Sequence, residues 1–171
     1  EGGALKANLD NNCYVIRVPA DAMAHSNGMQ IYPVIGETDG AEHLSQYLAV
    51  VEQGQSPILM YPGSDVVLFV QSGQGTVKIG GESFPVSAET GVCIKPGEGF
   101  QVENALAEPI SMNISVCPPC LTPEFPEKMP DVFDASFSNR VQGVDEDIRE
   151  EMADRFFQVL IGEKTHGTPV T

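Results

Sequence analysis

The sequence predicts an all-β fold, a barrel or a sandwich, and three observations support this prediction. The chain has 17 Gly and 13 Pro among 171 residues, which suits tight turns better than long helices. Short β-rich segments follow one another between Ser45 and Val116, at intervals of about 8–12 residues. Gly or Pro stands at nearly every corner between them. This rhythm is typical of β-sandwiches and β-barrels.

Two candidate strands precede the regular series. Residues 13–18 form a short β-rich run that ends at Pro19, and residues 29–35 form a second run. Pro33 lies inside the second run, and because proline cannot donate to a ladder, we expect an edge or bulged position there. Residues 1–39 are therefore interpreted as N-terminal strands and loops that pack on the barrel.

Residues 40–117 are predicted to form the barrel itself. The segment at 66–71 is nearly continuously apolar, and the others alternate in part, as strands that bury one face do. The expected strands cover residues 46–52, 58–61, 66–71, 76–79, 82–86, 91–95, 101–103 and 110–116.

The character of the chain changes after Val116. Five prolines lie within residues 118–130, so residues 118–144 are predicted to be an extended, proline-rich arm. Residues 145–171 are predicted to hold a short acidic helix and a terminal strand. Acidic side chains fill the first turn of this helix, and an apolar stripe with a period of four residues predicts about three turns.

The charge of the chain excludes two classes of partner. The net charge is −15, from 24 acidic and 9 basic side chains. Nucleic acids and anionic membranes are both held by clusters of Lys and Arg, so neither is expected as a partner. Nearly half of the charge, −7, falls within residues 121–154, which hold ten acidic and three basic side chains. We therefore expect the arm to be solvated.

The sequence favours a cytoplasmic location. No run of about 18 apolar residues could span a membrane. The first residues lack the basic and apolar stretches of a secretory signal. Four cysteines are too few for a disulfide scaffold, so a reducing compartment is the simpler expectation.

No nucleophile or metal motif is evident outside the barrel strands. Cys117-Pro-Pro-Cys120 has the spacing of a redox or half-zinc motif, but its prolines disfavour a helix, and we interpret it as a turn. His25, His43 and His166 share no spacing typical of metal sites. The sequence also lacks a Gly-x-Ser-x-Gly elbow and a phosphate-binding Gly-Lys-Ser/Thr loop. We predict no catalytic residue.

Residues 54–104 resemble the cupin family, whose fold is a small jelly-roll β-barrel. Gly54 and Gly73 fall on the spacing of the family's first motif, and residues 91–97, with Pro96-Gly97, look like the second motif, one residue short. In the family, His, His, Glu and His from these motifs converge on one divalent metal. Here the corresponding positions are Met60, Pro62, Val66 and Gln101.

These substitutions remove the family's metal chemistry. Proline and valine side chains offer no donor atom, a thioether is a poor ligand for Mn, Fe, Ni or Zn, and Gln101 could give one oxygen. The resemblance therefore implies a cupin-like jelly-roll barrel without a metal ligand set and without a cofactor. We expect its interior to be filled by apolar side chains.

A cavity for a small polar ligand is the alternative to a filled interior. Strand alternation places Gln101 and Glu103 on one face, and a carboxylate in an apolar cavity would have a raised pKa. In the other interpretation, Glu103 lies near the barrel mouth and is solvated. The candidate ligand cavity consists of Tyr47, Met60, Val66, Leu68, Gln101 and Glu103.

Two functional hypotheses follow from the resemblance. The first is a metal-free barrel with a structural or small-molecule-binding role. The second is part of a metal-dependent cupin enzyme, of the dioxygenase, isomerase, decarboxylase or lyase class, whose metal site lies elsewhere. Residues 153–171 compare weakly with residues 41–50 and could begin a second barrel. The family also implies a homodimer, formed by β-strand exchange, or packing on a second cupin barrel.

Overall fold

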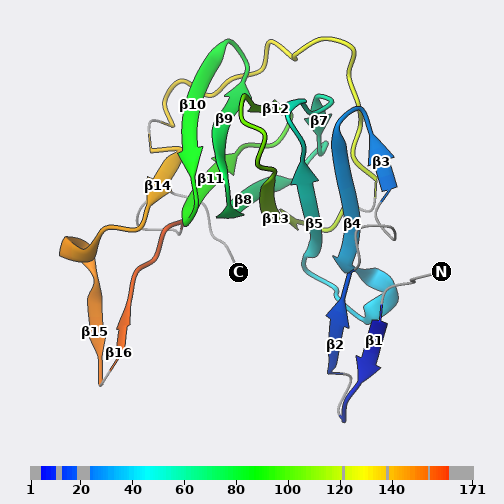
Figure 1. Ribbon diagram of the computed structural model, residues 1–171, viewed down its shortest axis with the longest axis vertical. Coiled ribbons are helices and arrows are strands. Elements are labelled where there is room, and N and C mark those ends of the chain that lie inside the picture. The colour runs from blue at the N-terminus through cyan, green and yellow to red at the C-terminus, as the bar shows by residue number, and fades with distance from the viewer. Residues whose placement is uncertain are drawn as a thin grey trace.

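The computed structural model describes residues 5–10, 13–18, 24–120, 122–137, 139–153 and 155–161. Two antiparallel sheets face each other and enclose one apolar core, so the predicted all-β fold is confirmed (Figure 1). None of the helices in these residues is long and apolar enough to cross a membrane.

The larger sheet has seven strands in the order β14-β11-β8-β13-β5-β4-β3. Its ladder shifts register between Pro33 and Ile35, which confirms the bulge expected at Pro33. The strands are β3 (Ala24–Ser26), β4 (Met29–Ile35), β5 (Ser45–Val51), β8 (Asp65–Ser72), β11 (Thr90–Ile94), β13 (Ile110–Cys117) and β14 (Val141–Gly143).

The smaller sheet has five strands in the order β10-β9-β12-β6, and β7 pairs with a different part of β12 than β6 does. The strands are β6 (Gly54–Gln55), β7 (Leu59–Met60), β9 (Gln74–Ile79), β10 (Glu82–Ser87) and β12 (Gly99–Asn104). All eight strands expected between residues 46 and 116 are present, each within two residues of its predicted ends. The short strands β3, β6 and β14 were not expected.

Strand alternation builds the core between the two sheets. Every second residue of β5 and β13 is buried, as are Val66, Leu68 and Val70 of β8, and inward residues of β9 and β12 are buried as well. Leu68 and Ile114 come from the larger sheet, and Val77 and Phe100 from the smaller one, each no more than 1% exposed. The barrel interior is therefore a packed hydrophobic core.

The expected helix of about three turns over residues 145–154 is wrong. The structure has one 3-10 turn, η3 (Glu146–Ile148), followed by the hairpin of β15 (Glu150–Met152) and β16 (Arg155–Phe157). The side chain of Asp145 caps the turn by accepting from the Asp147 amide at 2.9 Å. Ile148 is 53% exposed, so this residue of the predicted apolar stripe lacks the packing that stabilises short helices.

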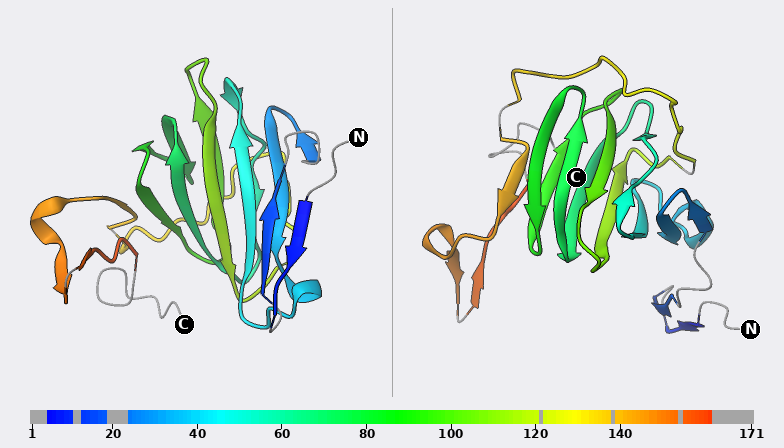
Figure 2. Two further views of the ribbon diagram at one scale, coloured as in Figure 1. Left: turned by 60° about the horizontal axis from the view of Figure 1, so that its bottom comes forward. Right: turned by 45° about the horizontal axis from the view of Figure 1, so that its top comes forward.

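Two hairpins extend from the barrel on opposite sides (Figures 1 and 2). The N-terminal hairpin joins β1 (Leu5–Asn8) to β2 (Tyr14–Arg17), so the strand predicted at residues 13–18 is present. A short 3-10 helix, η2 (Glu37–Asp39), lies between β4 and β5. The C-terminal hairpin starts its second strand at Arg155, where the terminal strand was predicted. Residues 162–171 lie outside the described residues.

The proline-rich arm passes over one end of the barrel, drawn in yellow at the top of Figure 1. Glu124 and Met60 exchange two backbone hydrogen bonds of 2.8 and 3.0 Å. Further along, Pro130 lies against Gly99 and Phe133 against Gly80, at positions where a Cβ atom on either glycine would come within 3.0 Å. The arm then ends in β14, which pairs with β11.

Candidate functional site

The four positions that carry metal ligands in cupins do not form a ligand set here. Val66 lies in the core at 1% exposure, and Pro62 is exposed in the turn before β8. Met60 is half-buried on β7, and Gln101 donates its side-chain amide to the Ser56 carbonyl oxygen at 2.8 Å. Within the described residues, no group of three or more His, Cys, Asp or Glu could hold a metal ion.

Aromatic rings occupy the part of the interior next to these positions. The Tyr61 ring lies 6.0 Å from the Tyr47 ring and 6.5 Å from the Phe100 ring, measured between centroids. The Tyr47 hydroxyl donates to the Cys120 carbonyl oxygen at 2.6 Å, whereas the buried Tyr61 hydroxyl has no partner in the described residues. Burial raises the pKa of both tyrosines, which keeps these hydroxyls protonated.

The structure divides the six residues predicted to line a ligand cavity. Tyr47, Val66 and Leu68 are buried in the core. Met60, Gln101 and Glu103 are only half-buried, so the six residues do not line one cavity.

The division follows from which alternate side chains of β12 face the core. Phe100, Val102 and Asn104 are buried on its inner side, which turns Gln101 and Glu103 to the outer face of the smaller sheet. The expected alternation of Gln101 and Glu103 is confirmed, and of the two alternatives for Glu103 the structure matches the solvated one and not the cavity. Burying a phenylalanine and a valine is favourable by roughly 1.5–3 kcal/mol for each side chain, whereas burying an amide and a carboxylate is costly.

Glu103 is therefore a solvated carboxylate rather than a buried acid. Its Oε2 lies 2.9 Å from the Lys78 ammonium, and its Oε1 accepts from the Gln55 amide at 3.1 Å. These hydrogen bonds, that of Lys78 first, lower the pKa of Glu103, which fits the solvated alternative and not the cavity, where the pKa would be raised.

Gln101 borders a groove of about 430 Å³ on the outside of the barrel. One wall comes from the smaller sheet and the other from the arm. Buried Ser56 anchors the sheet side, because its backbone amide donates to the Val102 carbonyl oxygen at 2.8 Å and its Oγ accepts from the Val102 amide at 2.9 Å. The lining includes Asn27, Gln55, Gln101, Phe125 and Glu127.

A buried ion pair fastens the end of the arm to the barrel. Both guanidinium NH2 groups of Arg140 bond the two carboxylate oxygens of Glu98 at 2.6 Å, and both side chains are 1% exposed. The Glu98 carboxylate also accepts from the backbone amides of Lys95 and Asp134, at 2.8 and 2.7 Å. We call the pair of Glu98 and Arg140 the latch.

Aromatic rings and backbone groups complete the surroundings of the latch. The Arg140 guanidinium lies 4.5 Å from the centre of the Phe133 ring and donates to the Asp134 carbonyl oxygen at 2.8 Å. The Cys93 amide donates to the Arg140 carbonyl oxygen at 2.8 Å. Sequence reasoning missed the latch, whose members are 42 residues apart.

The Cys-Pro-Pro-Cys segment holds the chain where it leaves β13. Cys117 and Cys120 carry free thiols. The Pro118 carbonyl oxygen accepts from the Ser64 hydroxyl at 2.9 Å, and the Cys120 carbonyl oxygen accepts from Tyr47. The backbone of this segment is therefore tied to the barrel through hydroxyl groups.

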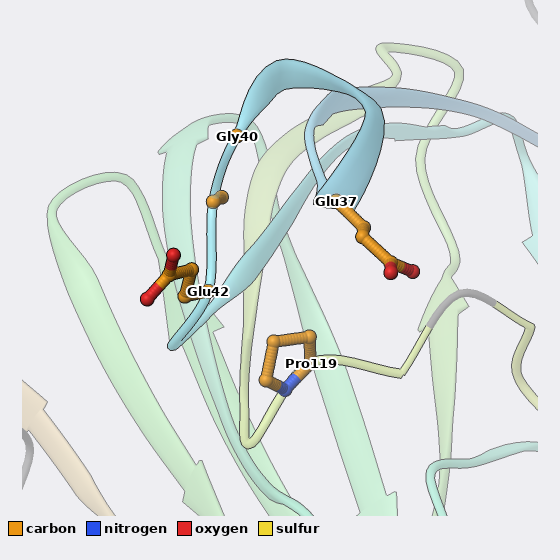
Figure 3. A pocket seen from close by; sticks show the side chains of 5 residues that line it. Glu37, Gly40, Glu42 and Pro119 are labelled. Carbon is orange, nitrogen blue, oxygen red and sulfur yellow. The ribbon is translucent and has the colours of Figure 1, made fainter.

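A larger hollow of about 760 Å³ lies beside the same segment. It is lined by Glu37, Gly40, Ala41, Glu42 and Pro119. Figure 3 shows the two glutamate carboxylates on either side of the Pro119 ring, pointing away from each other. They do not converge on one point, as a carboxylate pair in acid–base catalysis or metal binding would.

Of the three histidines, only His43 has a side chain among those that the structure describes. His43 is exposed before β5. For His25, in β3, the structure describes the backbone only, and His166 lies outside the described residues.

The fold is that of cupins. A Klebsiella pneumoniae protein with a double-stranded β-helix domain matches at TM-score 0.54 and 20% identity, over 63% of this chain and 93% of that one. The Schizosaccharomyces pombe Cnp3 cupin domain matches at 0.51 and 10% identity, over 69% and 89%. Lactobacillus farciminis oxalate decarboxylase matches at 0.56 and 14% identity, over 60% of this chain and 32% of that one. No protein-family model matches the sequence, and no curated protein does.

Proposed function

We propose that this cupin-fold barrel is a metal-free domain with a structural or ligand-binding role. The observation that carries the proposal is Val66, a side chain without a donor atom that is buried at a position where cupins have a metal ligand. Pro62 removes a second donor, and Gln101 faces outward. A divalent metal in the interior would therefore meet hydrocarbon instead of imidazole or carboxylate.

The packing of the molecule supports a structural role. Buried side chains from both sheets form one cluster, and the arm is fastened over one end of the barrel by the latch. Such a body presents a fixed outer surface while its interior is filled. Ligand binding is accordingly assigned to the outside of the barrel.

Thermal unfolding in the presence of metal ions tests the proposal. A ligand that binds only the folded state raises Tm, by an amount that grows with the logarithm of its concentration once this is well above Kd. We expect Mn²⁺, Fe²⁺, Ni²⁺ and Zn²⁺ each to leave the Tm of the chelator-treated protein unchanged. A saturable rise in Tm with any of these ions would contradict the proposal.

A second candidate function is a unit of a larger metal-dependent cupin enzyme. The observation that favours it is the match to oxalate decarboxylase, in which the matched part is 32% of that chain. In such an enzyme, this barrel would support a second barrel that holds the metal. The mass and metal content of the protein isolated from its native source test this candidate. A larger chain with bound metal supports it, and a metal-free chain of this size rules it out.

Self-association and a reducing compartment are further parts of the proposal. The free thiols of Cys93, Cys117 and Cys120 suit a reducing setting such as the cytoplasm.

The short edge strands β3 and β14 and the two projecting hairpins leave backbone groups that a second copy could pair with. Light scattering coupled to size-exclusion chromatography tests the homodimer, and a monomeric mass at all concentrations would contradict it.

A further inference from the structure

The groove between the smaller sheet and the arm presents oriented hydrogen-bond acceptors. The Gln101 side chain donates from Nε2 to the Ser56 carbonyl oxygen at 2.8 Å. A carbonyl oxygen can only accept, so the NH2 group of Gln101 must face Ser56. Its Oε1 is then left as an acceptor, with no donor among the described residues.

Gln55 is oriented in the same way from the neighbouring strand β6. Its Nε2 donates to Glu103 Oε1 at 3.1 Å, and Glu103 is kept ionised by Lys78 at 2.9 Å. An ionised carboxylate accepts hydrogen bonds only, so the amide of Gln55 cannot be reversed. The Gln55 Oε1 is therefore the second acceptor on this wall of the groove.

The opposite wall adds a ring face and a charge. Phe125 is 49% exposed although it is a large apolar side chain, and Glu127 is exposed with no ion pair among the described residues. Both line the groove together with Asn27. Among the residues with described side chains, the lining of this groove holds no lysine, arginine or histidine. A carboxylate, an aromatic face and carbonyl oxygens all attract N–H groups of a cation.

We propose that this outer groove binds a small organic cation that carries N–H donors, either a primary ammonium or a guanidinium group. The cation lies over the Phe125 ring, its N–H groups donate to Gln101 Oε1 and Gln55 Oε1, and Glu127 balances its charge. The proposal goes beyond the metal-free barrel, because the groove lies outside the core and keeps its donors and acceptors whether or not the interior holds a metal.

Two other ligand chemistries fit the groove less well. An anion would meet the Glu127 carboxylate and the net charge of −15 without a compensating base in the lining. A neutral sugar hydroxyl both donates and accepts, whereas the NH2 groups of Gln101 and Gln55 each give one of their two N–H donors to the protein. A cation with several N–H groups is donor-only and therefore complements these acceptors.

Isothermal titration calorimetry with agmatine, which carries a guanidinium and a primary ammonium group, tests the proposal. We expect one saturable site in about 0.15 M NaCl, where interactions between distant surface charges are screened. Phe125→Ala and Glu127→Gln should each weaken binding roughly two- to fivefold, and the double variant by about tenfold. Both side chains are exposed, so the variants should fold as the parent does.

The controls distinguish specific binding in the groove from general attraction of a cation to an acidic protein. Glu82→Gln removes the same charge from β10, outside the groove, and should leave agmatine binding unchanged. Tetramethylammonium has the charge but no N–H donor, and D-glucose has hydroxyls but no charge, so both should bind more weakly than agmatine. Equal binding of either probe, no saturable binding of agmatine, or equal losses in Glu82→Gln and Glu127→Gln would each overturn the proposal. If the groove does not bind agmatine, the test of the metal-free barrel by thermal unfolding with metal ions still stands on its own.

Discussion

The barrel and the arm are held in place by different kinds of interaction. In the barrel, stability is spread over alternating apolar residues of two sheets, of which Leu68 is one. The arm is charged and rich in proline, and it is held at a few points that end at the latch of Glu98 and Arg140. The acidic arm was expected to be solvated, yet it contributes one of the most deeply buried side chains, Arg140. The proline-rich, acidic composition of the arm therefore indicates that the arm has little regular secondary structure. It does not indicate that the arm is detached from the barrel.

Breaking the latch should have the largest effect. Arg140→Ala leaves the Glu98 carboxylate buried without its partner, and we expect it to lower the free energy of unfolding by about 3–5 kcal/mol. Urea denaturation measures the loss. Asp131→Asn, an exposed change in the same arm, should have almost no effect and is the matched control.

Two further variants distinguish the contribution of the latch to stability from that of the barrel core. A double change, Glu98→Leu with Arg140→Met, removes both charges and should recover only part of the lost stability, because the Lys95 and Asp134 amides still lose their acceptor. Leu68→Ala should cost about 3 kcal/mol by opening a core cavity. Arg140→Ala and the double change should both speed hydrogen exchange at the Asp134 amide under native conditions, whereas Leu68→Ala should not, because that amide donates to Glu98 at 2.7 Å. Equal exchange in all variants would mean that the latch does not fasten the arm.

The contact between the arm and the smaller sheet can be tested at Gly99. A Cβ atom there would lie 2.5 Å from Cδ of Pro130, so Gly99→Ala should destabilise the fold by about 1–3 kcal/mol. The control is Gly81→Ala, where a Cβ would meet nothing within 4 Å and the change should be small. Similar denaturation midpoints for the two variants would show that the arm does not press on β12.

The thiol of Cys93, buried next to the latch, predicts a loss of stability at alkaline pH. Burial raises its pKa from the ordinary 9.0 to about 11 in the folded protein. Below pH 9 the thiol is protonated in both states and its contribution is complete. Between pH 9 and pH 11 the unfolded thiol ionises first, so the free energy of unfolding falls, by about 1–2 kcal/mol. Cys93→Ala should lose less stability over this range, and parallel curves for the two proteins would contradict the assignment.

The smallest expected effect is a gain in stability inside the barrel. The Tyr61 hydroxyl is buried without a hydrogen-bond partner among the described residues. Tyr61→Phe removes that unpaired group and keeps the ring between Tyr47 and Phe100, so we expect a gain of about 1 kcal/mol. A clear loss of stability would show that the hydroxyl has a partner in the interior, such as a bound ligand.

The strands of the barrel could be predicted because their signals are local. Alternation and corner residues located β5, β8 and β13 within two residues, and Pro33 marked a bulge. The sequence left open whether Gln101 and Glu103 face the interior or the solvent, and the structure turns both outward. The apolar residues Phe100 and Val102 alternate with Gln101 and Glu103 in the sequence. This alternation already marks Phe100 and Val102 as the residues that face the core.

The attachments of the arm could not be predicted, for a physical reason. Glu98 and Arg140 are 42 residues apart, and neither lies in a periodic pattern that would mark it as buried. The outer groove likewise joins Asn27, Gln101 and Phe125, which come from three separate parts of the chain. Contacts of this kind depend on the path of the arm across the barrel, which no local signal records.

The metal content of the protein tests the central claim most directly. The protein should be purified without chelators or metal-affinity steps from cells grown with added Mn, Fe, Ni and Zn, and analysed by inductively coupled plasma mass spectrometry. Because Met60, Pro62, Val66 and Gln101 do not converge as donors, we predict only trace amounts of all four metals. One tightly bound metal ion for each barrel would contradict the account of the interior as a metal-free apolar core.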